Sequence, residues 1–132
     1  MIFIDSDIIL DTALRRVPFA HFADELFNQA KEINLGTSAH CLLNVYYLGR
    51  RSFGSTATRG MIGNLIQQVR VFPVDESHLS TALVSRISDF EDAVQHAVAV
   101  ANNCRYLITR NLSDYKHAEL PVLTAEQFLN TL

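Results

Sequence analysis

The N-terminal segment 1–11 constrains the fold more than any other part of the sequence. It places an apolar run, Ile2–Ile4, directly before a carboxylate, Asp5. A short apolar run that contains two β-branched residues is typical of a buried central strand in an α/β sheet. Ligands of such sheets bind at the edge formed by the carboxyl ends of the strands. Asp5 is therefore the first candidate functional residue.

Composition and charge narrow the class of protein. The chain has 132 residues, 48% of them hydrophobic, which predicts one domain over residues 1–132 with a core of its own. The net charge of −3 is not that of a typical nucleic-acid binder, although clustered carboxylates would mask a basic rim. Cys41 and Cys104 lack zinc or redox spacing and predict buried, reduced thiols in a cytoplasmic protein. Asp5 and Asp7 interrupt the N-terminal apolar run, so neither a signal peptide nor a membrane span is expected.

The rest of the sequence alternates between segments of helical and strand character. Such alternation predicts βαβ units and therefore an α/β fold, a three-layer α/β/α sandwich around a mainly parallel sheet. A basic, flexible turn is expected over residues 49–55. The expected strands after the first cover 34–38, 69–74, 104–111 and 121–124, and the expected helices cover 8–14, 17–33, 39–51, 56–68, 75–87, 89–101 and the residues after Thr124.

Segments that are distant in the sequence bring carboxylates to one edge of this sheet. The first strand ends at Asp5, and Asp114 lies in the loop after the strand at 104–111. The helix at 89–101 begins at the same edge, so Asp89 and Asp92 can reach it. Like charges gathered in one place persist mainly when a cation holds them together. Because no His or Cys recurs at ligand spacing, the oxygen ligands favour Mg²⁺ or Mn²⁺.

These acids lie in four short motifs, at residues 3–11, 89–95, 108–115 and 121–129. In this order the motifs resemble the PIN domain, a family of metal-dependent ribonucleases that includes the toxins of VapBC toxin–antitoxin pairs. The resemblance covers essentially the whole chain. It implies an endoribonuclease that uses Mg²⁺ or Mn²⁺ and leaves 5′-phosphate and 3′-hydroxyl ends on RNA. A toxin role, which rests on analogy of fold alone, would further imply an antitoxin partner.

The resemblance also assigns roles to individual residues. Asp5, Asp92 and Asp114 match three acids of the family's site, which implies that they are catalytic and bind metal. Thr109 and Asn111 match the polar residues at the end of a strand, which support the site. For Thr109 and Asp114, the structural alternatives are an ordinary strand end and an ordinary turn residue.

One position departs from the family pattern. The family usually has a Glu in the helix after the second strand, and this sequence has Asn44 there. An amide adds no charge, so the departure predicts a lower metal affinity. It also leaves open a second function, a catalytically weakened PIN fold that binds RNA or a protein. Asp7 stands where relatives often have Asn, and as a further metal ligand it would partly restore the charge.

Two further acidic residues and three arginines are candidates for either a structural or a binding role. Asp89 is predicted to cap a helix more than to bind metal, and Asp11 to be structural. Arg110, next to the acids, is predicted to contact an RNA phosphate. Arg50 and Arg51 are further candidates for RNA binding, with a solvated loop as the alternative.

The first strand and the residues that follow it also suggest a phosphotransferase, and one helix suggests a dimer contact. The sequence Asp5-Ser6-Asp7 directly after a strand, with Thr109 as a second-motif hydroxyl, is similar to phosphotransferases of the haloacid dehalogenase type. Against this, Ile8 stands where those enzymes have a glycine, and no suitable lysine follows. Homodimers are common in PIN proteins, and apolar residues of the helix at 39–48 would supply the contact.

Overall fold

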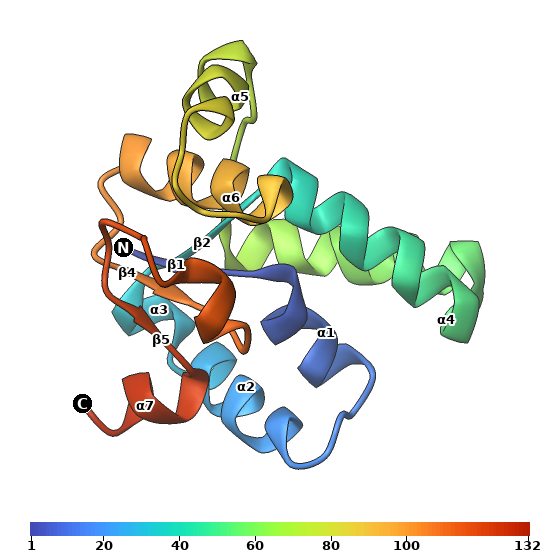
Figure 1. Cartoon of the computed structure of the whole chain (residues 1–132). Helices are drawn as coiled ribbons and strands as arrows, with labels where there is room; N and C mark the ends of the chain where they lie inside the picture. Colours follow the sequence, from blue (N-terminus) through green and yellow to red (C-terminus); the bar gives the residue numbers. More distant parts are fainter.

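A five-stranded parallel sheet with helices on both faces forms the protein (Figure 1). The structure is a computed structural model and describes all 132 residues. The strand order is β3-β2-β1-β4-β5, and every neighbouring pair is parallel, which confirms the predicted α/β fold. The strands are β1 Ile2–Ile4, β2 Leu35–Ser38, β3 Arg70–Phe72, β4 Tyr106–Ile108 and β5 Val122–Leu123.

Alternation along the central strand β1 divides the core into two layers. Ile2 and Ile4 point into one cluster of buried residues, which they share with α1, α2, α7 and part of α4. Phe3 points into the opposite cluster, which is built largely from α6 and the end of α5. This is the alternation that a strand buried on both faces requires. The helices are α1 Ser6–Ala13, α2 Phe19–Asn28, α3 Ala30–Ile33, α4 Ala39–Gln68, α5 Glu76–Leu83, α6 Phe90–Ala101 and α7 Ala125–Leu129, with one 3-10 turn, η1 Leu112–Tyr115.

The order of strands places β1 between β2 and β4. At this point the sheet stops growing toward one edge and begins to grow toward the other. β1 is followed along the chain by β2 on one side, whereas β4 enters on the other side after α6. The crevice at the carboxyl end of such a switch point is the usual ligand site of an open α/β sheet. In this protein that point lies between the ends of β1 and β4.

The region around residues 49–55 differs from the expected flexible turn. Residues 39–68 are helical throughout except at Gly54, whose φ of 80° and ψ of 169° break the helix. Such a positive φ favours glycine, because it has no Cβ to clash with the backbone. The two arms of α4 fold back on each other at this point (Figure 1). The basic residues before Gly54 therefore lie on a helix, and the prediction of a loop there was wrong.

Two of the predicted helices are longer than the helices in the structure. The apolar stripe of residues 17–33 is divided at Gln29 into α2 and α3, and α3 ends at Asn34 in a left-handed conformation. Helix α5 ends at Leu83, four residues before the expected end. The chain turns there and buries Ile87 in the same cluster as α6, so packing overrides the helical propensity of this segment.

Gly36 in β2 allows the ring of Phe72 to pack directly against the strand. A Cβ at position 36 would lie 2.7 Å from Cε2 and 2.9 Å from Cζ of Phe72, which is itself buried. We expect Gly36→Ala to lower the free energy of unfolding by about 1–3 kcal/mol in urea denaturation, because the ring must shift within a packed core. Gly63→Ala is the matched control, since nothing lies within 4 Å of its Cβ position and it is helical. Equal stability of Gly36→Ala and the wild type would show that the ring of Phe72 does not pack against Gly36.

Candidate functional site

Asp5 occupies the end of the central strand and the start of α1. Its backbone N–H donates to the carbonyl oxygen of Ile108 at 3.0 Å, which joins the ends of β1 and β4. Its carboxylate Oδ1 accepts a hydrogen bond from the backbone N–H of Ser6 at 2.8 Å and caps the helix. Only 6% of the residue is exposed. The carboxylate therefore lies, nearly buried, at the edge where the two central strands end.

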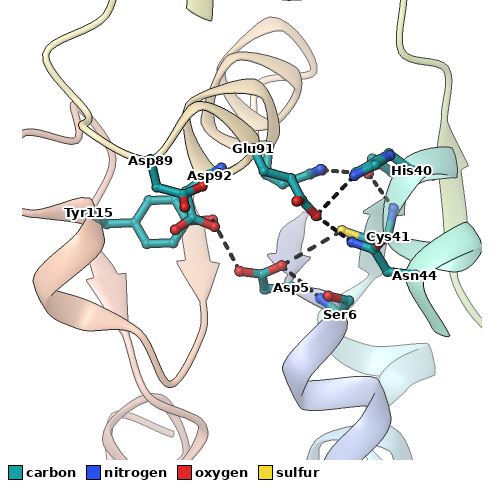
Figure 2. A network of polar contacts seen from close by, with 11 residues as sticks. Asp5, Ser6, His40, Cys41, Asn44, Asp89, Glu91, Asp92 and Tyr115 are labelled. Carbon is teal, nitrogen blue, oxygen red and sulfur yellow. Dashed lines mark hydrogen bonds and ion pairs between the residues drawn. The ribbon is translucent and has the colours of Figure 1, made fainter. Parts of the chain in front are cut away.

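The phenol of Tyr115 connects Asp5 with Asp92, which lies in the first turn of α6 (Figure 2). The hydroxyl oxygen is 3.1 Å from Asp5 Oδ2 and 3.3 Å from Asp92 Oδ1. Burial raises the pKa of Tyr115 far above its ordinary value, so the phenol stays neutral and acts as a donor. It has one proton and therefore compensates only one of the two carboxylates at a time. The sequence pattern did not single out Tyr115, although an aromatic residue directly after Asp114 is a visible signal.

Thr109 connects Asp5 with Asp7 in the same way. Its hydroxyl is 3.2 Å from Asp5 Oδ2 and 3.1 Å from Asp7 Oδ2, and again one proton faces two carboxylates. Asp7 Oδ2 also accepts from the backbone N–H of Arg110 at 2.9 Å. The second oxygen, Asp7 Oδ1, is buried and has no hydrogen-bond partner. The hydrogen bonds from the protein thus leave part of the negative charge of the cluster without a partner.

The pKa values of the carboxylates reflect this shortage of positive partners. Burial, followed by the charge of Asp7, raises the pKa of Asp5 to about 6. Burial, followed by the charges of Asp5, Asp89 and Asp114, raises the pKa of Asp92 to about 7. The pKa of Asp7 is also raised, chiefly by burial. The site therefore contains several carboxylates that each make the ionisation of another more costly.

The residues fit a hard divalent cation by the chemistry of their donors. The orphaned oxygen of Asp7 and the raised pKa values of Asp5 and Asp92 indicate a place where a positive charge would be stabilised. Carboxylate and hydroxyl oxygens are ligands that suit Mg²⁺ and Mn²⁺. No group of three or more His, Cys, Asp or Glu side chains is arranged to hold a metal ion as it stands. The side chains therefore fit a divalent cation in the type of their ligand atoms and in their charge.

The structure places the other predicted acidic and polar residues around this centre. Asp89 is exposed and caps α6, because its Oδ1 accepts from the backbone N–H of Asp92 at 2.9 Å. Asp114 is half-buried in η1, near enough that its charge contributes to the raised pKa of Asp92. Asn111 donates its backbone N–H to the hydroxyl of Thr109 at 3.2 Å and so orients that hydroxyl.

Arg110 lies beside the acidic cluster and forms part of a neighbouring cavity. Its Nε is 2.9 Å from Asp11 Oδ2, and its guanidinium carbon lies 4.2 Å from the centre of the Phe19 ring. Asp11 is 1% exposed and pairs with arginine, which agrees with the structural role expected for it. The cavity has a volume of about 260 Å³ and is also lined by Asn111 and Thr124. It is adjacent to the carboxylate cluster and does not contain Asp5.

Arg50 and Arg51 are not brought to the cluster. Both are exposed in the first arm of α4, shortly before Gly54, where the helix folds back away from the sheet (Figure 1). At a rise of 1.5 Å per residue, Arg50 is roughly 16 Å along the helix from Ala39 at its start. The guanidinium of Arg50 lies over the ring of Tyr47, 5.1 Å from its centre.

Asn44 faces a carboxylate that the sequence pattern did not single out, Glu91. The side-chain Nδ2 of Asn44 donates to Glu91 Oε1 at 2.5 Å, and Nε2 of His40 lies 3.0 Å from the same oxygen (Figure 2). The hydrogen bond from Asn44, followed by that from His40, lowers the pKa of Glu91. The pKa of Glu91 is therefore shifted downward, whereas the pKa values of Asp5 and Asp92 are shifted upward. This contact joins the start of α6 to α4.

A buried polar layer supports the site from α4 and α6. The Sγ of Cys41 lies 3.8 Å from Asp5 Oδ1, and burial, followed by the charge of Asp5, raises the pKa of this thiol to about 12. Ser38 accepts from the backbone N–H of Cys41 at 3.0 Å and donates to Oε1 of Gln95 at 2.5 Å. Both cysteines are free and buried, as expected from their spacing. At its raised pKa, the Cys41 thiol is a neutral neighbour of Asp5.

Comparison with known proteins identifies the family. The profile of the PIN domain matches residues 1–113, so the chain belongs to the PIN domain family. No curated protein matches the sequence. Family membership removes the haloacid dehalogenase hypothesis and fits a sheet whose acids gather at the carboxyl edge.

Solved structures with the same fold include proteins of toxin–antitoxin systems. A toxin–antitoxin complex from Klebsiella pneumoniae has a TM-score of 0.73 and 19% identity, covering 95% of this chain and 98% of that one. VapBC2 from Rickettsia felis, bound to a DNA fragment from its promoter, has a TM-score of 0.70 and 16% identity, with 93% and 97% covered. VapC20 from Mycobacterium tuberculosis, a toxin that cleaves the sarcin–ricin loop, has a TM-score of 0.69 and 22% identity, with 92% and 99% covered. At these identities the likeness establishes the fold.

The fold is therefore that of VapC nucleases, and PIN nucleases generally use divalent metals. None of the helices combines the length and the apolar character that a membrane crossing requires.

Proposed function

We propose that this protein is an endoribonuclease that hydrolyses RNA phosphodiester bonds with the help of Mg²⁺ or Mn²⁺. The observation that carries the proposal is the meeting of Asp5 and Asp92 across Tyr115, with Asp114 next to them. Burying carboxylates together is costly unless a cation compensates their charge. Membership of the PIN domain family supports the same conclusion.

Each residue of the cluster has a role in this proposal. Asp5, Asp92 and Asp114 would hold the cation, and Asp7, with its orphaned buried oxygen, would add a further carboxylate. A divalent cation bound there supplies a water of lowered pKa and a counter-charge for the phosphate under attack. Thr109 fixes the orientation of Asp5 and Asp7 through its hydroxyl group.

Tyr115 orients Asp5 and Asp92 through its phenol and, being nearly fully buried, keeps solvent from their inner side. Carboxylates fixed in this way need little reorganisation to hold a cation, and the cation would compensate the charge that develops on the phosphate.

The RNA strand would pass over the basic rim of the site. Arg110 is joined to the acids through its backbone, since its N–H donates to Asp7 Oδ2 at 2.9 Å. Its ion pair with Asp11 uses Nε, so the two terminal nitrogens remain for a phosphate. Arg50 and Arg51 would contact a more distant part of the RNA, because they lie further along α4.

We extend the proposal to protein partners of the toxin–antitoxin kind. The Klebsiella pneumoniae structure is a toxin–antitoxin complex, which supports a small antitoxin protein as the partner of this chain. An antitoxin side chain of positive charge would suit the acidic cluster. A homodimer through α4 would cover Leu43, Tyr47 and Leu48, whose exposed fractions are 57%, 56% and 40%. Such a toxin would act in the cytoplasm, where its RNA substrate is found.

A cleavage assay with the purified protein tests the proposal. We expect cleavage of a mixed RNA substrate with Mn²⁺ and none with EDTA, with 5′-phosphate ends on the products. An RNA that is bound but left intact with both Mn²⁺ and Mg²⁺ would instead favour the second function, a binding module weakened at Asn44. An RNA that is neither bound nor cleaved would contradict both.

A further inference from the structure

We propose that Glu91 supplies the carboxylate that position 44 lacks, so that the metal site is completed from α6 instead of from α4. The inference rests on the proposed function, because it concerns the same cation. It assigns to Glu91 a direct or water-mediated metal contact and to Asn44 the role of positioning Glu91. The juxtaposition that carries it is the pairing of the Asn44 amide with the Glu91 carboxylate across the site.

The contacts show that this carboxylate has a defined position. Oε1 of Glu91 accepts from Asn44 Nδ2 at 2.5 Å and lies 3.0 Å from His40 Nε2. Both contacts reach the same oxygen, which leaves Oε2 for a further partner. In Figure 2 the Glu91 carboxylate lies between Asp92 and Asn44, on the side of the site toward Asp5. Holding a Glu side chain that is 56% exposed in one position costs rotamer entropy, and the contacts with Asn44 and His40 offset that cost.

The start of α6 spreads its acids over two sides of the cluster. Successive residues of an α-helix point about 100° apart, so Glu91 and Asp92 face different neighbours. Asp92 turns toward Tyr115, and Glu91 turns toward α4. Asp5 lies between these directions, at the end of β1 (Figure 2). One helix turn thus supplies a carboxylate to each side of the same centre.

The amide at position 44 is complementary to this arrangement. A carboxylate at 44 would face Glu91 Oε1 at the distance now occupied by a donor, and two like charges so close would repel. Asn44 and Glu91 therefore form a matched pair in which the amide is on α4 and the acid is on α6. The reversed pair, an acid on α4 and an amide on α6, would place one negative charge in the same region. The departure at position 44 is then an exchange of position and not a loss of charge.

Calorimetric titration with Mn²⁺ tests this exchange without relying on cleavage. We expect Glu91→Gln to weaken Mn²⁺ binding by about 10- to 100-fold relative to the wild type. The reversed pair, Asn44→Glu with Glu91→Gln, should recover at least half of the loss in the logarithm of the Mn²⁺ affinity. Glu76→Gln is the matched control, since Glu76 is also exposed in the first turn of a helix and should leave the affinity unchanged.

Two results would overturn the inference and one would overturn the proposed function. Mn²⁺ affinity of Glu91→Gln within twofold of the wild type would exclude Glu91 from the site. Failure of the reversed pair to bind better than Glu91→Gln would exclude the exchange with position 44. If the wild type itself binds no Mn²⁺, and Asp5→Asn changes nothing, the proposed function fails before Glu91 is tested. Circular dichroism of each variant confirms that it is folded.

Discussion

Replacement of Asp5 by Asn is expected to reduce Mn²⁺-dependent RNA cleavage by about a thousandfold or more, the scale of losing a principal electrostatic group of an active site. Asn is nearly isosteric with Asp and also caps helices well, so α1 should keep its start. The substitution removes the charge at the centre of the cluster and little else. The measurement is kcat/KM on a fluorogenic RNA at saturating Mn²⁺.

Asp75→Asn is the control for this prediction. Asp75 also caps a helix, α5, through its side chain, so the same chemical change is made at a cap outside the carboxylate cluster. We expect it to leave cleavage unchanged and Asp92→Asn to be nearly as damaging as Asp5→Asn. Full activity of Asp5→Asn would remove this carboxylate from the catalytic site.

The second large effect is expected in the pH dependence of stability without metal. The pKa of Asp5 is raised to about 6 and that of Asp92 to about 7, so the native protein binds more protons than the unfolded chain between about pH 4 and pH 7. Stability must therefore fall as pH rises through this window. The shift of Asp5 corresponds to about 3 kcal/mol at most. Asp92 is only half-buried, so screening by solvent makes its contribution smaller.

Urea denaturation at pH 5, 6.5 and 8, with and without Mn²⁺, measures this effect. We expect the metal-free wild type to be least stable at pH 8 and Mn²⁺ to reverse the loss, by about 2.7 kcal/mol at a hundred times its Kd. Asp5→Asn should be more stable than the wild type at pH 8 without metal and should gain less from Mn²⁺. A free energy of unfolding that does not change with pH would show that these carboxylates are neither buried nor close together.

The sheet and its acidic edge could be predicted because the residue pattern of the first strand and the order of elements along the chain indicate the same fold. The apolar run before Asp5 is buried on both faces, and the alternation of helices and strands allows little but parallel pairing. Parallel strands end on one side, so the positions of Asp5 and Asp114 follow from the topology alone. Asp92 follows because α6 begins at the same edge.

The contacts between side chains could not be predicted in this way. Whether the hydroxyl of Tyr115 reaches Asp5 or the solvent depends on the path of η1, which no periodicity in the sequence encodes. The contact of Asn44 with Glu91 depends on how α4 and α6 pack across the sheet edge. The sequence predicts that Arg110 contacts a phosphate, but it does not show that tertiary packing places Asp11 and Phe19 beside the guanidinium.

In the proposed site, carboxylates from three distant segments share one divalent cation. The most direct test is a crystal structure of the wild type soaked in Mn²⁺, with anomalous diffraction recorded to locate the ion. We expect an anomalous peak within coordination distance of the carboxyl groups of Asp5, Asp92 and Asp114. Crystals that bind Mn²⁺ only elsewhere, or not at all, while these three carboxyl groups face separate patches of solvent, would contradict the claim.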